Sequence, residues 1–203
     1  MFGAEVGDRL ALEALKHDHG FGSGVPSALW QLVQVQQADG QIESALTTLT
    51  PLLNNEPSNP AYLVMAADLE LSLYLTQRSY LNHVNNKRSL ALLERLLEVD
   101  VANKVRIYRK IAQAYAADRH YATSLGYLEQ AAEYSIQNER NGVTADALWV
   151  EAAAMAMEIE EFGKAHGYLH KALAQNPQNP SAKQLLRELP ILDKYSQQFV
   201  NRD

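Results

Sequence analysis

The chain has no cysteine among its 203 residues. Disulfide bonds, thiolate metal sites and cysteine nucleophiles are therefore excluded, while the redox state of the compartment is left open. Blocks of basic residues are also absent, because acidic and basic residues are interspersed and the formal net charge is −6. Such a chain has no electrostatic footprint for nucleic acid or for an anionic membrane surface, and we expect neither as a partner.

Long apolar runs are missing as well. No stretch approaches the roughly 20 apolar residues that a membrane-spanning helix needs, and residues 1–15 lack the basic start and apolar centre of a signal peptide. We therefore expect a cytoplasmic protein with no membrane span. A periplasmic location is the alternative if Met1 replaces a removed signal peptide.

A helical pattern built around small residues is present instead. Apolar and small side chains recur at helical spacing near the end of the chain, at Trp149, Ala152, Ala153, Ala156, Phe162, Ala165, Leu169 and Ala172, and Pro177 follows them. The spacing predicts two antiparallel helices whose backbones come close at Ala153 and Ala165. One such pair cannot bury its own apolar face, so we expect stacked neighbouring pairs.

Three earlier segments repeat this pattern. The first unit starts near Pro26, turns at Gly40 and ends at residues 54–57, and the second starts at Asn59 and Pro60, a cap followed by a proline that suits a helix start. The second helix of this unit comes about ten residues late. The third unit places its helices around residues 108–115 and 121–131 and is also overlong. We expect the extra residues to lengthen helices or to form projecting loops.

This set of positions resembles the tetratricopeptide repeat family, with about four units over residues 26–178. The resemblance implies an all-α fold, a right-handed α-solenoid of stacked antiparallel helix pairs. Outside the repeats, we expect residues 1–25 to form an N-terminal helix and a glycine-rich link. Residues 179–203 are expected to form a C-terminal capping helix, which Pro190 bends or divides.

The resemblance also implies protein binding rather than catalysis, since such solenoids hold a peptide or a partner helix in the concave groove lined by the first helix of each unit. Carried over to this sequence, the groove is expected to include Trp30, Gln34, Gln37, Leu63, Ala67, Arg106, Arg109, Lys110, Gln113, Val150 and Ala154.

The basic residues of this set are its sharpest local feature. Arg106 and Lys110 lie four residues apart on one helical face, and Arg109 lies beside them, which suits a carboxylate or an acidic peptide. Arg106 and Lys110 match positions at which some family members clamp a C-terminal carboxylate, but the other units lack the asparagines of that clamp. The alternative is a solvated helix face paired with neighbouring acids. Trp30 has an alternative too, as a packing residue against the N-terminal helix.

We expect no catalytic, cofactor or metal site. The glycines of residues 20–24 follow no predicted strand and lack the lysine and serine of a phosphate-binding loop. His166 and His170 share a helical face, and His17, Asp18 and His19 are adjacent, but each group offers too few converging ligands for a transition metal. No nucleophile elbow or catalytic carboxylate pair is present, so an enzyme is not expected.

The sequence thus predicts a non-catalytic protein-binding scaffold or assembly factor. The alternative is a permanent structural subunit of a larger complex, bound through the convex face or the insertions. Residues 45–71 also resemble repeats appended to periplasmic zinc metallopeptidases that assist outer-membrane assembly, so an envelope-associated complex belongs to this alternative, although the peptidase signature is missing. A homo-oligomer is compatible with both functions.

Overall fold

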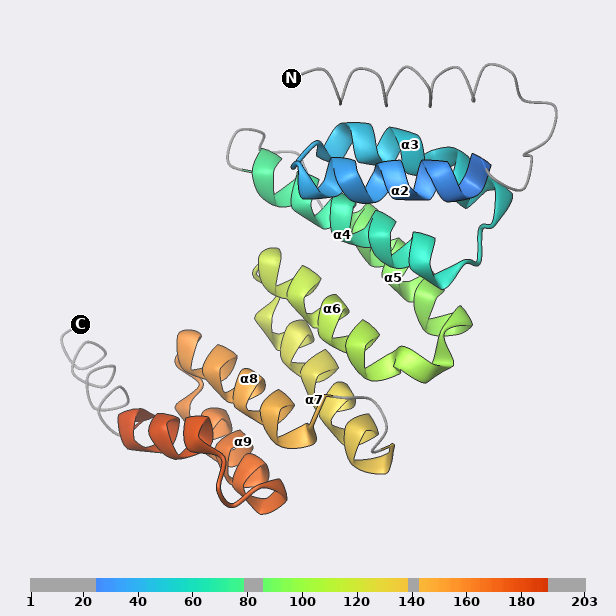
Figure 1. Ribbon diagram of the computed structural model, residues 1–203. Coiled ribbons are helices and arrows are strands. Elements are labelled where there is room, and N and C mark those ends of the chain that lie inside the picture. Colours follow the sequence, from blue (N-terminus) through green and yellow to red (C-terminus); the bar gives the residue numbers. More distant parts are fainter. Residues whose placement is uncertain (1–24, 79–85, 139–142, 190–203) are drawn as a thin grey trace. The chain divides into compact units, whose positions relative to one another are not determined.

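The structure is a computed structural model that describes residues 25–78, 86–138 and 143–189. These residues are mostly helical and contain no strand (Figure 1). The helices are α2 (Val25–Ala38), α3 (Ile42–Asn55), α4 (Pro60–Gln77), α5 (Lys87–Val99), the 3-10 turn η1 (Val101–Asn103), α6 (Lys104–Ala117), α7 (Tyr121–Gln137), α8 (Ala145–Glu158) and α9 (Phe162–Gln175). Residues 180–189 are also helical.

The predicted N-terminal helix and link, and the capping helix beyond residue 189, lie outside the described residues. None of the described helices is both long enough and apolar enough to cross a membrane.

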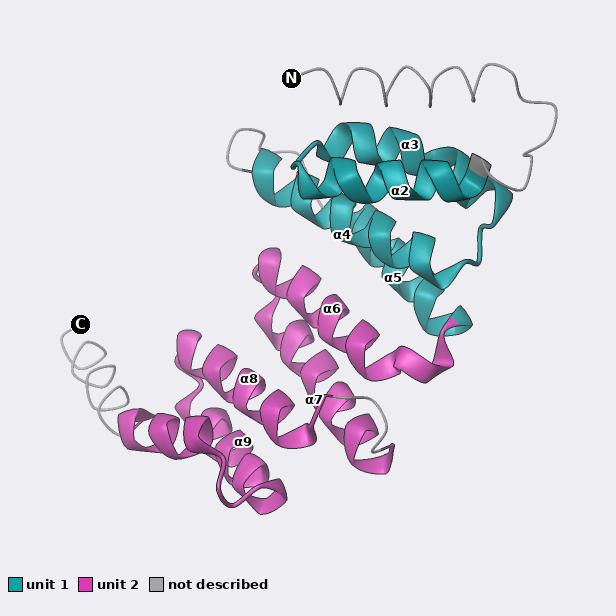
Figure 2. Cartoon of the chain, in the orientation of Figure 1, with its two compact units in different colours: residues 1–99 teal, residues 100–203 magenta. Residues whose placement is uncertain are grey.

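The chain divides into two compact units, residues 1–99 and residues 100–203 (Figure 2). Unit 1 contains α2 to α5, and unit 2 contains α6 to α9 with the helical residues 180–189. Within each unit every helix packs against the next one along the chain, so each unit stacks two of the four predicted helix pairs. The fold is therefore an all-α solenoid of antiparallel helix pairs, as predicted.

Unit 1 is held together by a core between its first three helices. The buried residues of this core are Leu29, Val33, Ala45, Leu49, Leu52, Tyr62, Ala66 and Leu69. Gly40 makes the turn between α2 and α3 with a φ of +73°, a left-handed conformation that favours glycine. At the start of α4, the Asn59 side chain accepts a hydrogen bond from the backbone N–H of Ala61, which confirms the predicted cap before Pro60.

Unit 2 has the close helix crossing that the small residues predict. The alanines at this crossing are fully buried, namely Ala152, Ala153 and Ala156 on α8 and Ala165 and Ala172 on α9. Trp149 and Leu169 are buried beside them. Because alanine leaves little beyond the backbone, the two helices approach closely and the larger side chains fill the space around the contact.

Two serines take the small position in the second and third repeats and add a bond that alanine lacks. The Ser124 hydroxyl donates to the Ala112 carbonyl at 2.7 Å, and the Ser89 hydroxyl donates to the Ala67 carbonyl at 2.9 Å. Both hydroxyls are buried. Each bond joins the second helix of a pair to the first helix of that pair.

Replacing Ser124 with alanine tests this bond with almost no change in volume. We expect the free energy of unfolding to fall by about 1 kcal/mol, the usual net value of one hydrogen bond. Urea unfolding followed by circular dichroism measures the change. The exposed neighbour Thr123, replaced with alanine, serves as the control and should leave the midpoint unchanged. A more stable Ser124→Ala protein would contradict the assigned role.

Candidate functional site

The predicted basic residues lie on one side of α6. Arg106 and Arg109 are exposed, Lys110 is half-buried, and Gln113 is exposed one turn further along. These positions are spaced by three, four and seven residues, which places them on a single helical face. The prediction that they share a face is consistent with the helix bounds of α6.

An ion pair joins this side of α6 to α8. The Nε atom of Arg109 lies 2.6 Å from Oε2 of Glu151, and the two side chains are 44% and 29% exposed. On α8, Val150 is half-buried against the core of unit 2, whereas Ala154 is exposed. We call this surface the α6–α8 face and define it by Arg106, Arg109, Lys110, Gln113, Glu151 and Ala154.

The ion pair changes the chemistry predicted for the basic cluster. Arg109 is partly neutralised by Glu151, so the alternative of a helix face paired with acids holds for Arg109. Arg106 has no ion-pair or hydrogen-bond partner within the described part of the chain. The α6–α8 face thus carries three cationic side chains and one carboxylate, and Arg106 is its accessible cation.

In unit 1, the predicted groove residues of α2 differ in exposure. Gln34 is exposed and Gln37 is half-buried. Trp30 is half-buried and packs against the ring of Tyr62 on α4, with ring centroids 5.1 Å apart. Part of the indole is therefore buried in the core of unit 1, in contact with Tyr62.

The expectation that Leu63 and Ala67 line an open groove is wrong for this structure. Their side chains are 0% and 1% exposed. The Ala67 carbonyl accepts the buried hydrogen bond from Ser89, so this residue lies at the contact between α4 and α5. Neither side chain offers surface to a partner.

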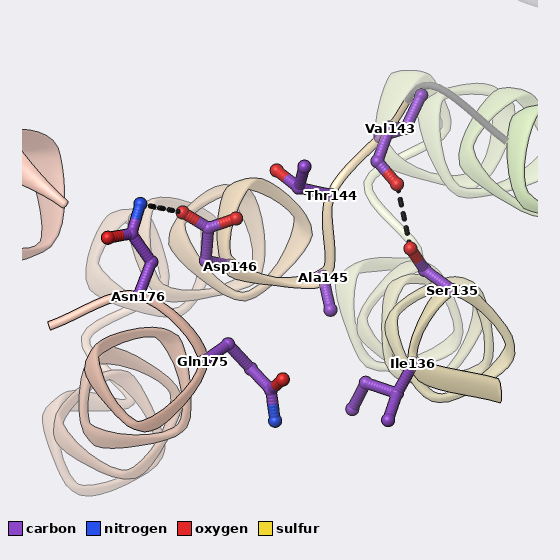
Figure 3. A pocket seen from close by; sticks show the side chains of 8 residues that line it. All are labelled: Ser135, Ile136, Val143, Thr144, Ala145, Asp146, Gln175 and Asn176. Atoms are coloured by element: carbon purple, nitrogen blue, oxygen red, sulfur yellow. Dashed lines mark hydrogen bonds between the residues drawn. The ribbon is translucent and has the colours of Figure 1, made fainter. Parts of the chain in front are cut away.

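A cleft of about 490 Å³ opens in unit 2 between α7, α8 and α9 (Figure 3). It is lined by Ser135, Ile136, Val143, Thr144, Ala145, Asp146, Gln175 and Asn176. Its polar groups bond to one another: the Ser135 hydroxyl donates to the Val143 carbonyl at 2.7 Å, and the Asn176 amide donates to Asp146 at 2.8 Å. These hydrogen bonds therefore join the segments that form the walls of the cleft.

Asp146 is the ionisable residue of this lining, and it is held in a network of donors. Burial alone would raise the pKa of the Asp146 carboxyl, but hydrogen bonds from Thr144, Asn179, Asn176 and the backbone N–H of Ala147 outweigh burial and lower the pKa. The carboxylate is thus charged at neutral pH and fully engaged. A general base or acid needs a pKa near the working pH, which this environment does not provide.

Sequence reasoning missed the Asp146 network, although a signal was present. Asn176 and Asn179 frame Pro177 directly after α9, and both amides donate to Oδ2 of Asp146 at 2.8 Å. A similar Asn-Pro step begins α4, where Asn59 donates to Glu56. In both turns an asparagine stands directly before a proline and three residues after an acidic or polar turn residue. This spacing is the sequence signal that the two turns share.

Metal ligands are sparse in the described part of the chain. No group of three or more histidine, aspartate or glutamate side chains there is arranged to hold an ion. His166 and His170 on α9 do lie together, with their Nε2 atoms 3.2 Å apart. The group formed by His17, Asp18 and His19 lies outside the described residues.

Comparison with known proteins gives a likeness of structure. No protein-family model matches the chain, and no curated protein does. Among solved structures, TTC0263, a thermophilic TPR protein in Thermus thermophilus, is similar with 17% identity and a TM-score of 0.55, over 93% of this chain and 91% of that one. The MamA protein is similar with 12% identity and a TM-score of 0.60, over 89% and 90%. PilW, a widely conserved type IV pilus biogenesis factor, has 18% identity and a TM-score of 0.56, over 85% and 72%.

Proposed function

We propose that this chain, which has the tetratricopeptide repeat fold, is a non-catalytic scaffold that binds an acidic peptide or a partner helix through the α6–α8 face. The single observation that carries the proposal is the basic character of this face on a chain whose net charge is −6. A local excess of cations on an acidic protein favours an acidic partner over a basic one.

The geometry of the face supports a peptide rather than a small molecule. Arg106 and Lys110 project from successive turns of α6, so they can contact acidic groups about one helical turn apart. Glu151 orients Arg109 through the 2.6 Å contact. Gln113 and Ala154 extend the face with a polar group and a small apolar group, which suit backbone and side-chain contacts of an extended segment.

Charge reversal tests the proposal. We expect Arg106→Glu with Lys110→Glu to weaken capture of the partner by at least about tenfold, because a charge-assisted hydrogen bond contributes roughly 1.5–3 kcal/mol and tenfold corresponds to about 1.4 kcal/mol. The measurement is affinity capture from the native extract with identification by mass spectrometry, followed by titration of the identified segment as a synthetic peptide.

The chain supplies a matched control for this experiment. Lys183 and Arg187 are also four residues apart on one helix, and replacing both with glutamate makes the same change in net charge. The control should keep the partner that Arg106→Glu with Lys110→Glu loses. A partner retained by both double variants would contradict binding at the α6–α8 face and would favour the alternative of a structural subunit bound elsewhere.

A further inference from the structure

We propose that His166 and His170 form half of a transition-metal site, and that a second copy of this chain completes it. Both side chains are exposed on α9, one helical turn apart. Their Nε2 atoms are 3.2 Å apart and their ring centroids are 4.4 Å apart. The two Nε2 atoms, which are the nitrogens proposed to bind the metal, therefore lie close together outside the helix.

The spacing of these nitrogens matches zinc. A tetrahedral zinc ion with Zn–N bonds of about 2.0–2.1 Å places two nitrogen ligands about 3.3 Å apart. Two neutral imidazoles at 3.2 Å share at most one hydrogen bond, with one ring donating to the other. When zinc binds, the ring that donated moves its proton from Nε2 to Nδ1, and both rings turn so that their Nε2 lone pairs point at the ion.

The two lysines on α9 contact other side chains. Lys164 lies 3.3 Å from the carboxylate of Glu161, and the Lys171 ammonium lies 4.2 Å from the centroid of the Trp149 ring. Lys164 is thus paired with a carboxylate, and the Lys171 ammonium is held over the indole ring.

The described part of one chain supplies too few ligands, since a stable zinc site usually has four. The described residues hold no group of three or more suitable side chains, so His166 and His170 need two further ligands from outside. A second copy related by a two-fold axis brings the same pair and completes a set of four imidazoles. Symmetric association of this kind is the commonest form of homodimer.

The surroundings of the pair allow a second protein to approach. Gly163 and Gly167 flank the histidines, and a Cβ atom added at either glycine would meet nothing within 4 Å. Ala174 is exposed on the same side of α9. The surface beside the imidazoles is therefore open. Each chain carries a net charge of −6, so a divalent cation between two copies also offsets their mutual repulsion.

The experiment uses the full chain without a histidine tag. Its mass is measured by light scattering after addition of half an equivalent of zinc chloride and again after EDTA. We expect zinc to raise the mass about twofold, as a two-fold symmetric site requires, and EDTA to reverse the change. Cobalt(II) in place of zinc should give the intense visible absorption of a four-coordinate ion.

Variants assign the effect to this pair. His166→Ala and His170→Ala should each lose both the mass increase and the cobalt absorption, with unchanged helix content because both side chains are exposed. His120→Ala and the double replacement of His17 and His19 with alanine serve as controls and should keep both signals. The proposal is overturned if zinc leaves the mass unchanged, if the increase survives without His166 and His170, or if one zinc ion binds to each monomer.

Discussion

Replacing Trp149 with alanine is expected to lower the free energy of unfolding of unit 2 by about 3–5 kcal/mol, the usual cost of removing a large buried aromatic side chain. Trp149 is only 3% exposed. It stacks on Tyr168 with ring centroids 5.7 Å apart and an angle of 15° between the ring planes. The Lys171 ammonium lies over the indole at 4.2 Å, so the substitution also removes a cation–π contact.

Tyr168 extends this contact to α7. Its hydroxyl donates to Glu129 at 2.7 Å, and burial together with the Glu129 carboxylate raises the pKa of Tyr168 well above its usual range. Removal of the indole therefore leaves a cavity beside a tyrosine that links two further helices. The alanines of the helix crossing cannot fill this space, because their side chains end at Cβ.

Urea unfolding followed by circular dichroism measures the loss in Trp149→Ala. Trp149→Phe is the control, since it keeps an aromatic ring in contact with Tyr168 and should lose clearly less stability. The chain has only two tryptophans, so fluorescence of Trp30 in the alanine variant reports on unit 1 alone. A loss below about 1 kcal/mol would show that the site collapses around the missing ring.

The helix crossings were predictable from the sequence because two helix backbones can come close only where the side chains between them are small. Ala153 and Ala165 are fully buried where the spacing predicts close backbones. The serines of the second and third repeats were predictable as small residues, but not as donors. Whether a serine hydroxyl reaches a carbonyl of the neighbouring helix depends on how the two helices are rotated against each other. The spacing of residues along one helix carries no information about that rotation.

The groove residues of α4 could not be assigned from the sequence for a different reason. Tyr62, Leu63, Ala66, Ala67 and Leu69 are all buried, so this helix is covered on more than one face. Periodicity separates an apolar face from a polar one, and it fails where both faces are apolar. Arg109 and Glu151 illustrate the same limit for charge, since 42 residues separate the two partners.

Asp146 gives the second large expected effect. Its Oδ2 atom accepts hydrogen bonds from Asn176 and Asn179, both at 2.8 Å. Asn179 in turn accepts from the backbone N–H of Ala182 at 2.9 Å and so starts the last described helix. A single carboxylate at the start of α8 therefore fixes the turn that follows α9.

We expect Asp146→Asn to lower the free energy of unfolding by about 2–3 kcal/mol at pH 7, because hydrogen bonds to a charged group are lost and buried donors are left without a good acceptor. An amide has one acceptor oxygen where the carboxylate has two, so in either orientation its NH2 group faces one or more of the groups that donate to Asp146. Urea unfolding measures the loss. Replacing the exposed Asp39 with asparagine is the control and should change the midpoint little.

The difference between the native protein and Asp146→Asn should depend on pH in a defined direction. The pKa of the Asp146 carboxyl is lowered in the folded chain, so the unfolded chain binds more protons around and below the usual aspartate pKa of about 4. The stability that the carboxylate contributes is thus complete above about pH 5 and is lost as the pH falls through the folded-state pKa. Unfolding measured at steps from pH 7 to pH 2 should show the two proteins converging, since titrations common to both cancel in the difference. A difference that stays constant to pH 2 would mean that the shape of the side chain, and not its charge, holds the turn.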